Sequence, residues 1–151
     1  MKFSLYRHKD LNFVELNVTG TEETYNKCDP ESRYIDSVAF NLFTRSFEKA
    51  NRLYDYFIPT RYNTRYIIPL RNNLMTQLAS LEQLRTLEEF REFIDRQVLG
   101  KDFLLALAGS DKIWADHWKQ YHKKLINLSK EILELVDFCI DEDRILWVIG
   151  F

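Results

Sequence analysis

The sequence predicts an α+β fold that is predominantly α-helical, with a helical bundle packed against a small antiparallel sheet. Apolar residues recur every three or four positions over most of the chain, as on the buried face of a helix. Near the N-terminus they alternate with polar residues, and the C-terminal run ILWVIGF is rich in β-branched residues, as strands are. We therefore expect an N-terminal hairpin and a C-terminal strand to form the sheet on which the helices pack.

The composition indicates one domain that covers residues 1–151. Of the 151 residues, 46% are hydrophobic and 29% are charged, and only four are glycine and three proline. A chain of this length buries roughly 68–70% of the surface that it exposes when unfolded, which is enough for a core. Because no apolar run resembles a signal peptide or a membrane span, we expect a cytoplasmic protein without membrane insertion.

The first elements are predicted to be two short strands that form a hairpin. Alternation with polar neighbours indicates these strands, which are separated by a polar loop at 7–10. The alternating residues are Phe3, Leu5, Val14, Leu16 and Val18.

A long helix is predicted to follow, from Asp29 to Phe57. Asp29 would cap it, Pro30 suits the first helical position, and Pro59 would end it. Its buried face would contain the apolar residues Ile35, Ala39, Phe40, Leu42, Phe43, Phe47, Ala50, Leu53, Tyr54 and Phe57.

Three helices are predicted in the middle of the chain. The first begins near Pro69 and buries Leu70, Leu74, Leu78 and Leu81. Thr86 and Glu89 have the spacing of a capping box, which predicts a new helix start, and Gly100 is expected to end that helix. A short helix over 102–108 follows.

The last helix carries an apolar seam with a strict heptad spacing, after a cap at Ser110. Such a seam packs along a neighbouring helix, either inside the bundle or, as the alternative, in a homodimer through residues 114–139. A strand over 145–149 would then join the hairpin. The seam residues are Trp114, Trp118, Tyr121, Leu125, Leu128, Ile132, Leu135 and Cys139.

The segment RLYDYFIPTRYNTRYIIPLR, residues 52–71, is the Arg-Tyr corner, in which four arginines are interleaved with four tyrosines. Arginine binds carboxylate and phosphate, and both residue types are common at interface hot spots. Pro59 and Pro69 divide the segment, and no core pattern dictates the orientation of its middle part. The predicted binding residues are therefore Arg61, Tyr62, Arg65 and Tyr66. The alternative is that the arginines pair with the acidic residues at 131–143.

Function is predicted to be non-enzymatic, as in a small regulatory or protein-interaction protein of the immunity, antitoxin or adaptor kind. The sequence has no phosphate loop and no CxxC or GxSxG motif, and no cofactor is expected. The first alternative is a nucleic-acid-binding protein that uses the Arg-Tyr corner, although the net charge of −2 gives this little support.

The second alternative is a small-ligand or metal-dependent enzyme with a site around Asp116, His117 and His122. The spacing of the histidines argues against a shared metal ion, because five residues correspond to about 140° around a helix. Asp116, His117 and His122 are therefore weak metal-ligand candidates.

Overall fold

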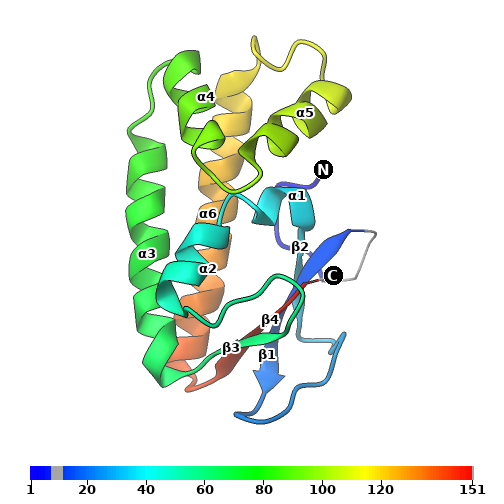
Figure 1. The fold of residues 1–151 in the computed structure, drawn as a ribbon, viewed down its shortest axis with the longest axis vertical. Helices are drawn as coiled ribbons and strands as arrows, with labels where there is room; N and C mark the ends of the chain where they lie inside the picture. The colour runs from blue at the N-terminus through cyan, green and yellow to red at the C-terminus, as the bar shows by residue number, and fades with distance from the viewer. Residues whose placement is uncertain (8–11, 151) are drawn as a thin grey trace.

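A four-stranded antiparallel sheet packs against helices in the computed structural model, which describes residues 1–7 and 12–150 (Figure 1). The fold is α+β and mostly helical, as predicted. The described elements are, in chain order, β1 (Phe13–Gly20), β2 (Arg33–Asp36), α1 (Ser37–Phe40), α2 (Thr44–Ala50), β3 (Thr60–Tyr62), α3 (Thr64–Glu82), α4 (Leu87–Asp95), α5 (Gly100–Ser110), α6 (Trp118–Asp141) and β4 (Ile145–Ile149).

The strand order is β2-β1-β4-β3, and every neighbouring pair is antiparallel. The prediction of a C-terminal strand over 145–149 is confirmed, and β4 lies between β1 and β3. Val14 of β1 lies opposite Ile35 of the edge strand β2, and Leu16 of β1 lies opposite Val148 of β4. The centre of the sheet thus joins strands from the two ends of the chain, so its formation needs long-range pairing.

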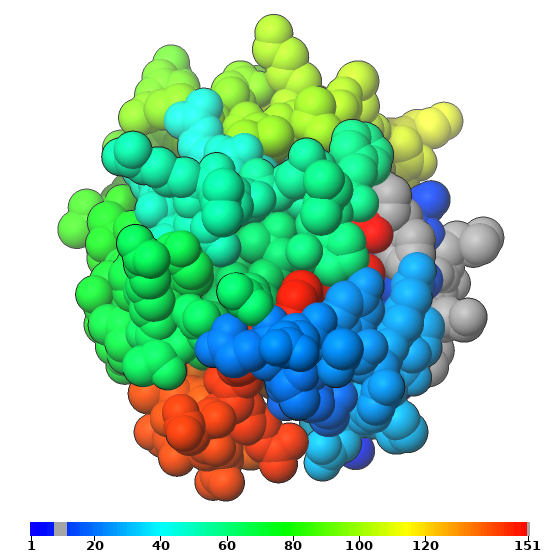
Figure 2. Space-filling view, turned by 60° about the horizontal axis from the view of Figure 1, so that its bottom comes forward, coloured from blue at the N-terminus to red at the C-terminus, as the bar shows by residue number. Residues whose placement is uncertain are grey.

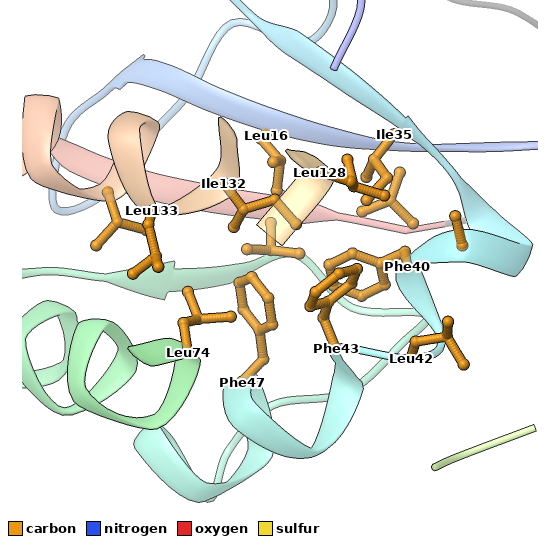
Figure 3. Packing of buried hydrophobic residues seen from close by; sticks show 14 of the residues in the cluster. Leu16, Ile35, Phe40, Leu42, Phe43, Phe47, Leu74, Leu128, Ile132 and Leu133 are labelled. Atoms are coloured by element: carbon orange, nitrogen blue, oxygen red, sulfur yellow. The ribbon is translucent and has the colours of Figure 1, made fainter. Parts of the chain in front are cut away.

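The core lies between the sheet and the helices. Leu16 and Ile35 point from the strands towards Leu128 and Ile132 of α6, and phenylalanines from the α1–α2 region fill the space beside them (Figure 3). All these side chains are buried. Burial of one such side chain stabilises the fold by about 1.5–3 kcal/mol.

The predicted N-terminal hairpin is wrong in its first strand. Residues 3–5 form no strand, because Phe3 packs on Phe103 and Tyr121 with ring centroids 5.9 and 5.8 Å away, and the amide of Leu5 donates to Glu131 Oε2 at 2.6 Å. Strand β1 instead pairs with β2 and β4. Most of the loop predicted at 7–10 lies outside the described residues.

The long helix predicted over 29–57 is also wrong. Asp29 stabilises a turn and not a helix start, because its carboxylate accepts a hydrogen bond from the amide of Glu31 at 2.9 Å. The chain then forms β2, and the first helix begins after Asp36, whose carboxylate accepts from the amides of Val38 and Ala39. Two short helices replace the long one, because pairing of β2 with β1 outweighs the local helical pattern.

The capping box of Thr86 and Glu89 is confirmed at the start of α4, but other helix ends were predicted incorrectly. Helix α3 begins at Thr64, so Pro69 lies within it. Gly100 opens α5 and does not end α4. A Cβ at Gly100 would lie 1.9 Å from the carbonyl oxygen of Ile94, so the close approach of two chain segments requires glycine here.

The heptad seam of the last helix packs inside the chain. Helix α6 begins at Trp118, after a turn, and lies against α3 (Figure 1). Trp114 precedes the helix and is buried; Leu125, Leu128, Ile132 and Cys139 are buried as well. The alternative of a homodimer through residues 114–139 would therefore have to use a seam that the fold already covers.

Candidate protein-binding surface

The connection between α2 and β3, residues 51–59, is held in one conformation by two side chains and is called the 51–59 loop below. Asn51, which is buried, donates from Nδ2 to the carbonyl of Arg61 at 3.2 Å and accepts from the amide of Leu53 at 3.0 Å. Asp55 accepts from the amide of Phe57 at 2.8 Å. Asparagine and aspartate stabilise turns through such bonds to the following backbone. The loop is therefore ordered by its own polar residues.

Two tyrosines attach the 51–59 loop to the rest of the fold. Tyr54 is half-buried with its ring 6.2 Å from that of Phe47, and burial raises the pKa of its phenol. The carbonyl oxygen of Tyr56 packs closely on Gly150, because a Cβ added at Gly150 would lie only 2.1 Å from it. The loop thus rests against both the core and the end of β4.

Three large apolar side chains project from the 51–59 loop into solvent. Leu53 is 79% exposed, Phe57 76% and Ile58 60%. Figure 2 shows the segment around residues 51–62 running across this face, beside the segment around residues 20–30. Single exposed apolar residues are ordinary, but three within six positions on a fixed loop are typical of an interaction surface.

This exposure corrects the prediction that Leu53 and Phe57 belong to the core face of a long helix. The helix ends at Ala50, so the spacing of three and four no longer holds beyond it. The sequence does contain a signal for this turn. Asn51 and Asp55 both favour turns, and they precede Pro59.

Two of the predicted binding residues, Arg61 and Tyr62, lie on β3 and point in different directions. Tyr62 is completely buried and donates its hydroxyl to the carbonyl of Phe47 at 2.9 Å, so its side chain forms part of the core and is not available to a partner. Burial raises the pKa of this phenol. Arg61 is exposed and pairs with Glu22, whose Oε2 lies 3.4 Å from the guanidinium.

The other two predicted residues, Arg65 and Tyr66, lie in the first turn of α3. The Cζ atom of Arg65 is 5.4 Å from the centroid of the Tyr66 ring, an arrangement typical of a cation–π contact. In the described part of the chain no acidic partner pairs with Arg65 or with Arg52. Arg52 belongs to the 51–59 loop and Arg65 to the start of α3, and both side chains are exposed. Whether they bind a partner stays a prediction.

The remaining arginine of the Arg-Tyr corner, Arg71, pairs with an acidic residue. Arg71 forms an ion pair with Asp137 of α6, as the alternative interpretation expected. The hydrogen bond to Asp137 raises the pKa of Arg71, so this residue stays charged. Together with the Arg61–Glu22 pair, this contact leaves the corner without a continuous row of free arginines for a phosphate backbone.

A buried carboxylate anchors part of the segment that contains Glu22, the acidic partner of Arg61. Glu15 is fully buried on β1 and accepts from the amide of Cys28 at 2.9 Å and from Ser32 Oγ at 2.7 Å. These bonds hold the segment 21–32 against the face of the sheet that lies away from the helices. Glu22 is part of that segment. Strand alternation had indicated an ordinary polar face for β1, so the sequence offered no signal for this role.

The weak metal-ligand candidates do not converge. His117 Nδ1 lies 2.8 Å from Asp111 Oδ2, whereas His122 Nε2 donates to the carbonyl of Leu81 at 2.6 Å. Asp116 is exposed. Among the described residues no group of three or more His, Cys, Asp and Glu side chains is arranged to hold a metal ion.

Asp111, which was not among the predicted metal-ligand candidates, organises the turn before α6. Its Oδ2 also accepts from the hydroxyl of Tyr121 at 2.9 Å. The hydrogen bond from His117 is the main cause that holds the pKa of Asp111 below its ordinary value. This cluster ties the turn to the first helical residues, which is a structural role.

No family model, curated protein or solved structure matches this chain. In the part of the chain that the structure describes, every helix is too short or too polar to cross a bilayer.

Proposed function

We propose that this protein is a non-enzymatic protein-interaction protein of the immunity, antitoxin or adaptor kind, and that its partner docks on the 51–59 loop. The observation that supports this most strongly is the exposure of Leu53, Phe57 and Ile58 on a loop held by Asn51 and Asp55. A preorganised loop loses little conformational entropy on binding, so most of the apolar contact becomes affinity.

The charges around the loop indicate the chemistry of the partner. Arg52 immediately precedes Leu53 in the loop, and Arg65 follows β3 in the first turn of α3; neither has an acidic partner in the described residues. An apolar pocket with an acidic rim would complement this surface, since opposite charges at the rim speed association and select the partner. Nucleic acid is the less favoured ligand, because Arg61 and Arg71 already pair with carboxylates.

The test compares two double variants of the full-length tagged chain, expressed in its native cell. Leu53→Ala with Phe57→Ala removes the proposed anchor. The matched control, Leu105→Ala with Ile113→Ala, removes two side chains that are 70% and 55% exposed elsewhere. Proteins captured by the wild type are identified by mass spectrometry, and the strongest is purified for calorimetry.

We expect the anchor variant to bind about 100-fold more weakly or worse, since each lost apolar side chain contributes about 1.5–3 kcal/mol, and the control to bind like the wild type. Equal affinity of the anchor and control variants would contradict the proposal. Capture that nuclease treatment abolishes would favour the nucleic-acid alternative. A dimer of the purified chain that the anchor variant abolishes, seen by sedimentation velocity, would identify a second copy as the occupant in place of another protein.

A further inference from the structure

A polar groove of about 580 Å³ lies on the flank formed by α2, α3 and α4, and none of its lining residues belongs to the 51–59 loop. Figure 1 shows α2 against α3, and α4 following the upper end of α3. Amide and hydroxyl side chains make up half of its lining. They are Ser46, Asn73, Thr76, Gln77, Ser80, Gln83 and Gln97.

Hydrogen bonds from α3 to α2 and to the turn before α2 fix one side of the groove. Gln77 donates from Nε2 to the carbonyl of Leu42 at 2.6 Å and accepts from Ser46 Oγ at 2.7 Å. Asn73 donates to the carbonyl of Ser46 at 3.3 Å. A ligand would therefore meet a preformed surface, as most small-molecule sites require.

The α2 wall carries two positive charges without a counter-charge. Arg45 and Lys49 both line the groove, are exposed, and lie one helical turn apart. In the residues that the structure describes, neither forms an ion pair. Like charges at this spacing destabilise a helix, so a bound anion would remove an unfavourable interaction.

The acidic residues of the opposite wall are already occupied. Glu92 pairs with Arg96 at 3.0 Å. Glu89 accepts from the backbone amides of Arg85 and Thr86, and these bonds lower the pKa of its carboxyl. Glu92 is thus paired with Arg96, whereas Glu89 stays ionised. Arg45, Lys49 and Arg96 still outnumber the two carboxylates of the lining, which leaves the groove net positive.

We propose that this groove binds a phosphate monoester on a small organic body, with the phosphate on Arg45 and Lys49. A monoester carries a charge of about −1.5 to −2 at neutral pH, which matches the two free cations, and arginine can contact two of its oxygens at once. Leu84 and Phe93 supply apolar surface in the groove for the organic body. The proposal is independent of the 51–59 loop.

Phenyl phosphate is the probe, titrated into the ¹⁵N-labelled full-length chain and followed by NMR. We expect saturable shifts at amides of the groove, including those of Ser46, Gln77 and Phe93. Arg45→Gln with Lys49→Gln should weaken binding about tenfold or more, because charged hydrogen bonds are lost. The matched control is Lys119→Gln with Lys123→Gln, which removes two exposed lysines one turn apart on α6, and it should not change the affinity.

Three further ligands test whether the groove recognises the phosphate group, the aromatic ring or only a negative charge. Phenol should not bind, and benzoate and inorganic phosphate should bind more weakly than phenyl phosphate. The absence of saturable shifts, or equal affinity in the two double variants, would overturn the proposal. Equal binding of benzoate would overturn the assignment of phosphate, and equal binding of inorganic phosphate would overturn the assignment of an organic monoester. Circular dichroism of each variant checks that it folds.

Discussion

Replacement of Tyr62 by phenylalanine removes one buried hydrogen bond and keeps the aromatic ring in place. The hydroxyl donates to the carbonyl of Phe47 at 2.9 Å, and that carbonyl also accepts from the amide of Asn51 at 3.0 Å. Because Phe47 keeps one donor, no buried group is orphaned. We expect the free energy of unfolding to fall by about 1 kcal/mol, and the melting temperature by about 2–4 °C.

Urea unfolding measured by tryptophan fluorescence tests this value, with the slope against urea expected to stay unchanged. Tyr66→Phe is the matched control, because this tyrosine is half-buried in the same segment and the described structure shows no hydrogen bond of its hydroxyl. We expect the control to change stability by less than about 0.5 kcal/mol. An unchanged Tyr62→Phe variant, or an equal loss in both variants, would refute the contribution assigned to the Tyr62–Phe47 hydrogen bond.

The same variant has a signature at alkaline pH. Burial raises the pKa of Tyr62 above the ordinary value of 10.0, so the folded state keeps a proton that the unfolded state loses more easily. The stability contributed by this difference is complete below the unfolded pKa and is lost as the pH rises beyond it. Tyr62→Phe should therefore lose less stability than the wild type between about pH 8 and about pH 11. A parallel decline would contradict this reasoning.

Two further predictions concern the helix ends. Gly100→Ala should destabilise the fold by about 2–4 kcal/mol in urea unfolding, because its Cβ would lie 1.9 Å from the carbonyl oxygen of Ile94. The control is Gly109→Ala, which has open space around the new Cβ and should stabilise the fold by about 0.5–1 kcal/mol. Equal effects would contradict the close approach. Asp111 has a lowered pKa, chiefly through His117, so its contribution is present above the unfolded pKa and lost as the pH falls through the folded one. His117→Gln should flatten the acid limb of a stability–pH profile, and an unchanged limb would exclude this pairing.

The sequence predicted elements whose chemistry is local. The capping box at Thr86 and Glu89 and the C-terminal strand Ile145–Ile149 are confirmed, because a side-chain-to-amide bond and a short β-branched run depend mainly on neighbouring residues. The seam of α6 was also recognised, since 24 helical residues give a period that is hard to mistake.

The region from Asp29 to Phe57 shows where local pattern is insufficient. Its apolar residues fit a helix, yet part of the segment forms β2, because pairing with β1 buries Tyr34 and Ile35. The alternation over residues 14–18 predicted a strand there, but no local pattern shows that residues 33–36 pair with it and do not continue a helix.

The candidate site divides in the same way. The sequence identified the Arg-Tyr corner, but could not tell that Tyr62 is buried and that Arg65 is exposed only three residues later. Strand alternation and the helix start at Thr64 decide those directions. It also could not show that Phe57 is exposed, because the end of α2 at Ala50 and the turn bonds of Asn51 and Asp55 break the helical spacing.

By itself, therefore, the sequence determined the α+β class, the presence of long amphipathic helices and the C-terminal strand, because hydrophobic periodicity and capping chemistry act within a few residues. Only the tertiary structure decided the strand partners, the ends of α1 and α2, and which side chains of the Arg-Tyr corner face solvent. Those outcomes depend on contacts between residues far apart in the chain, whose free energy no local pattern contains.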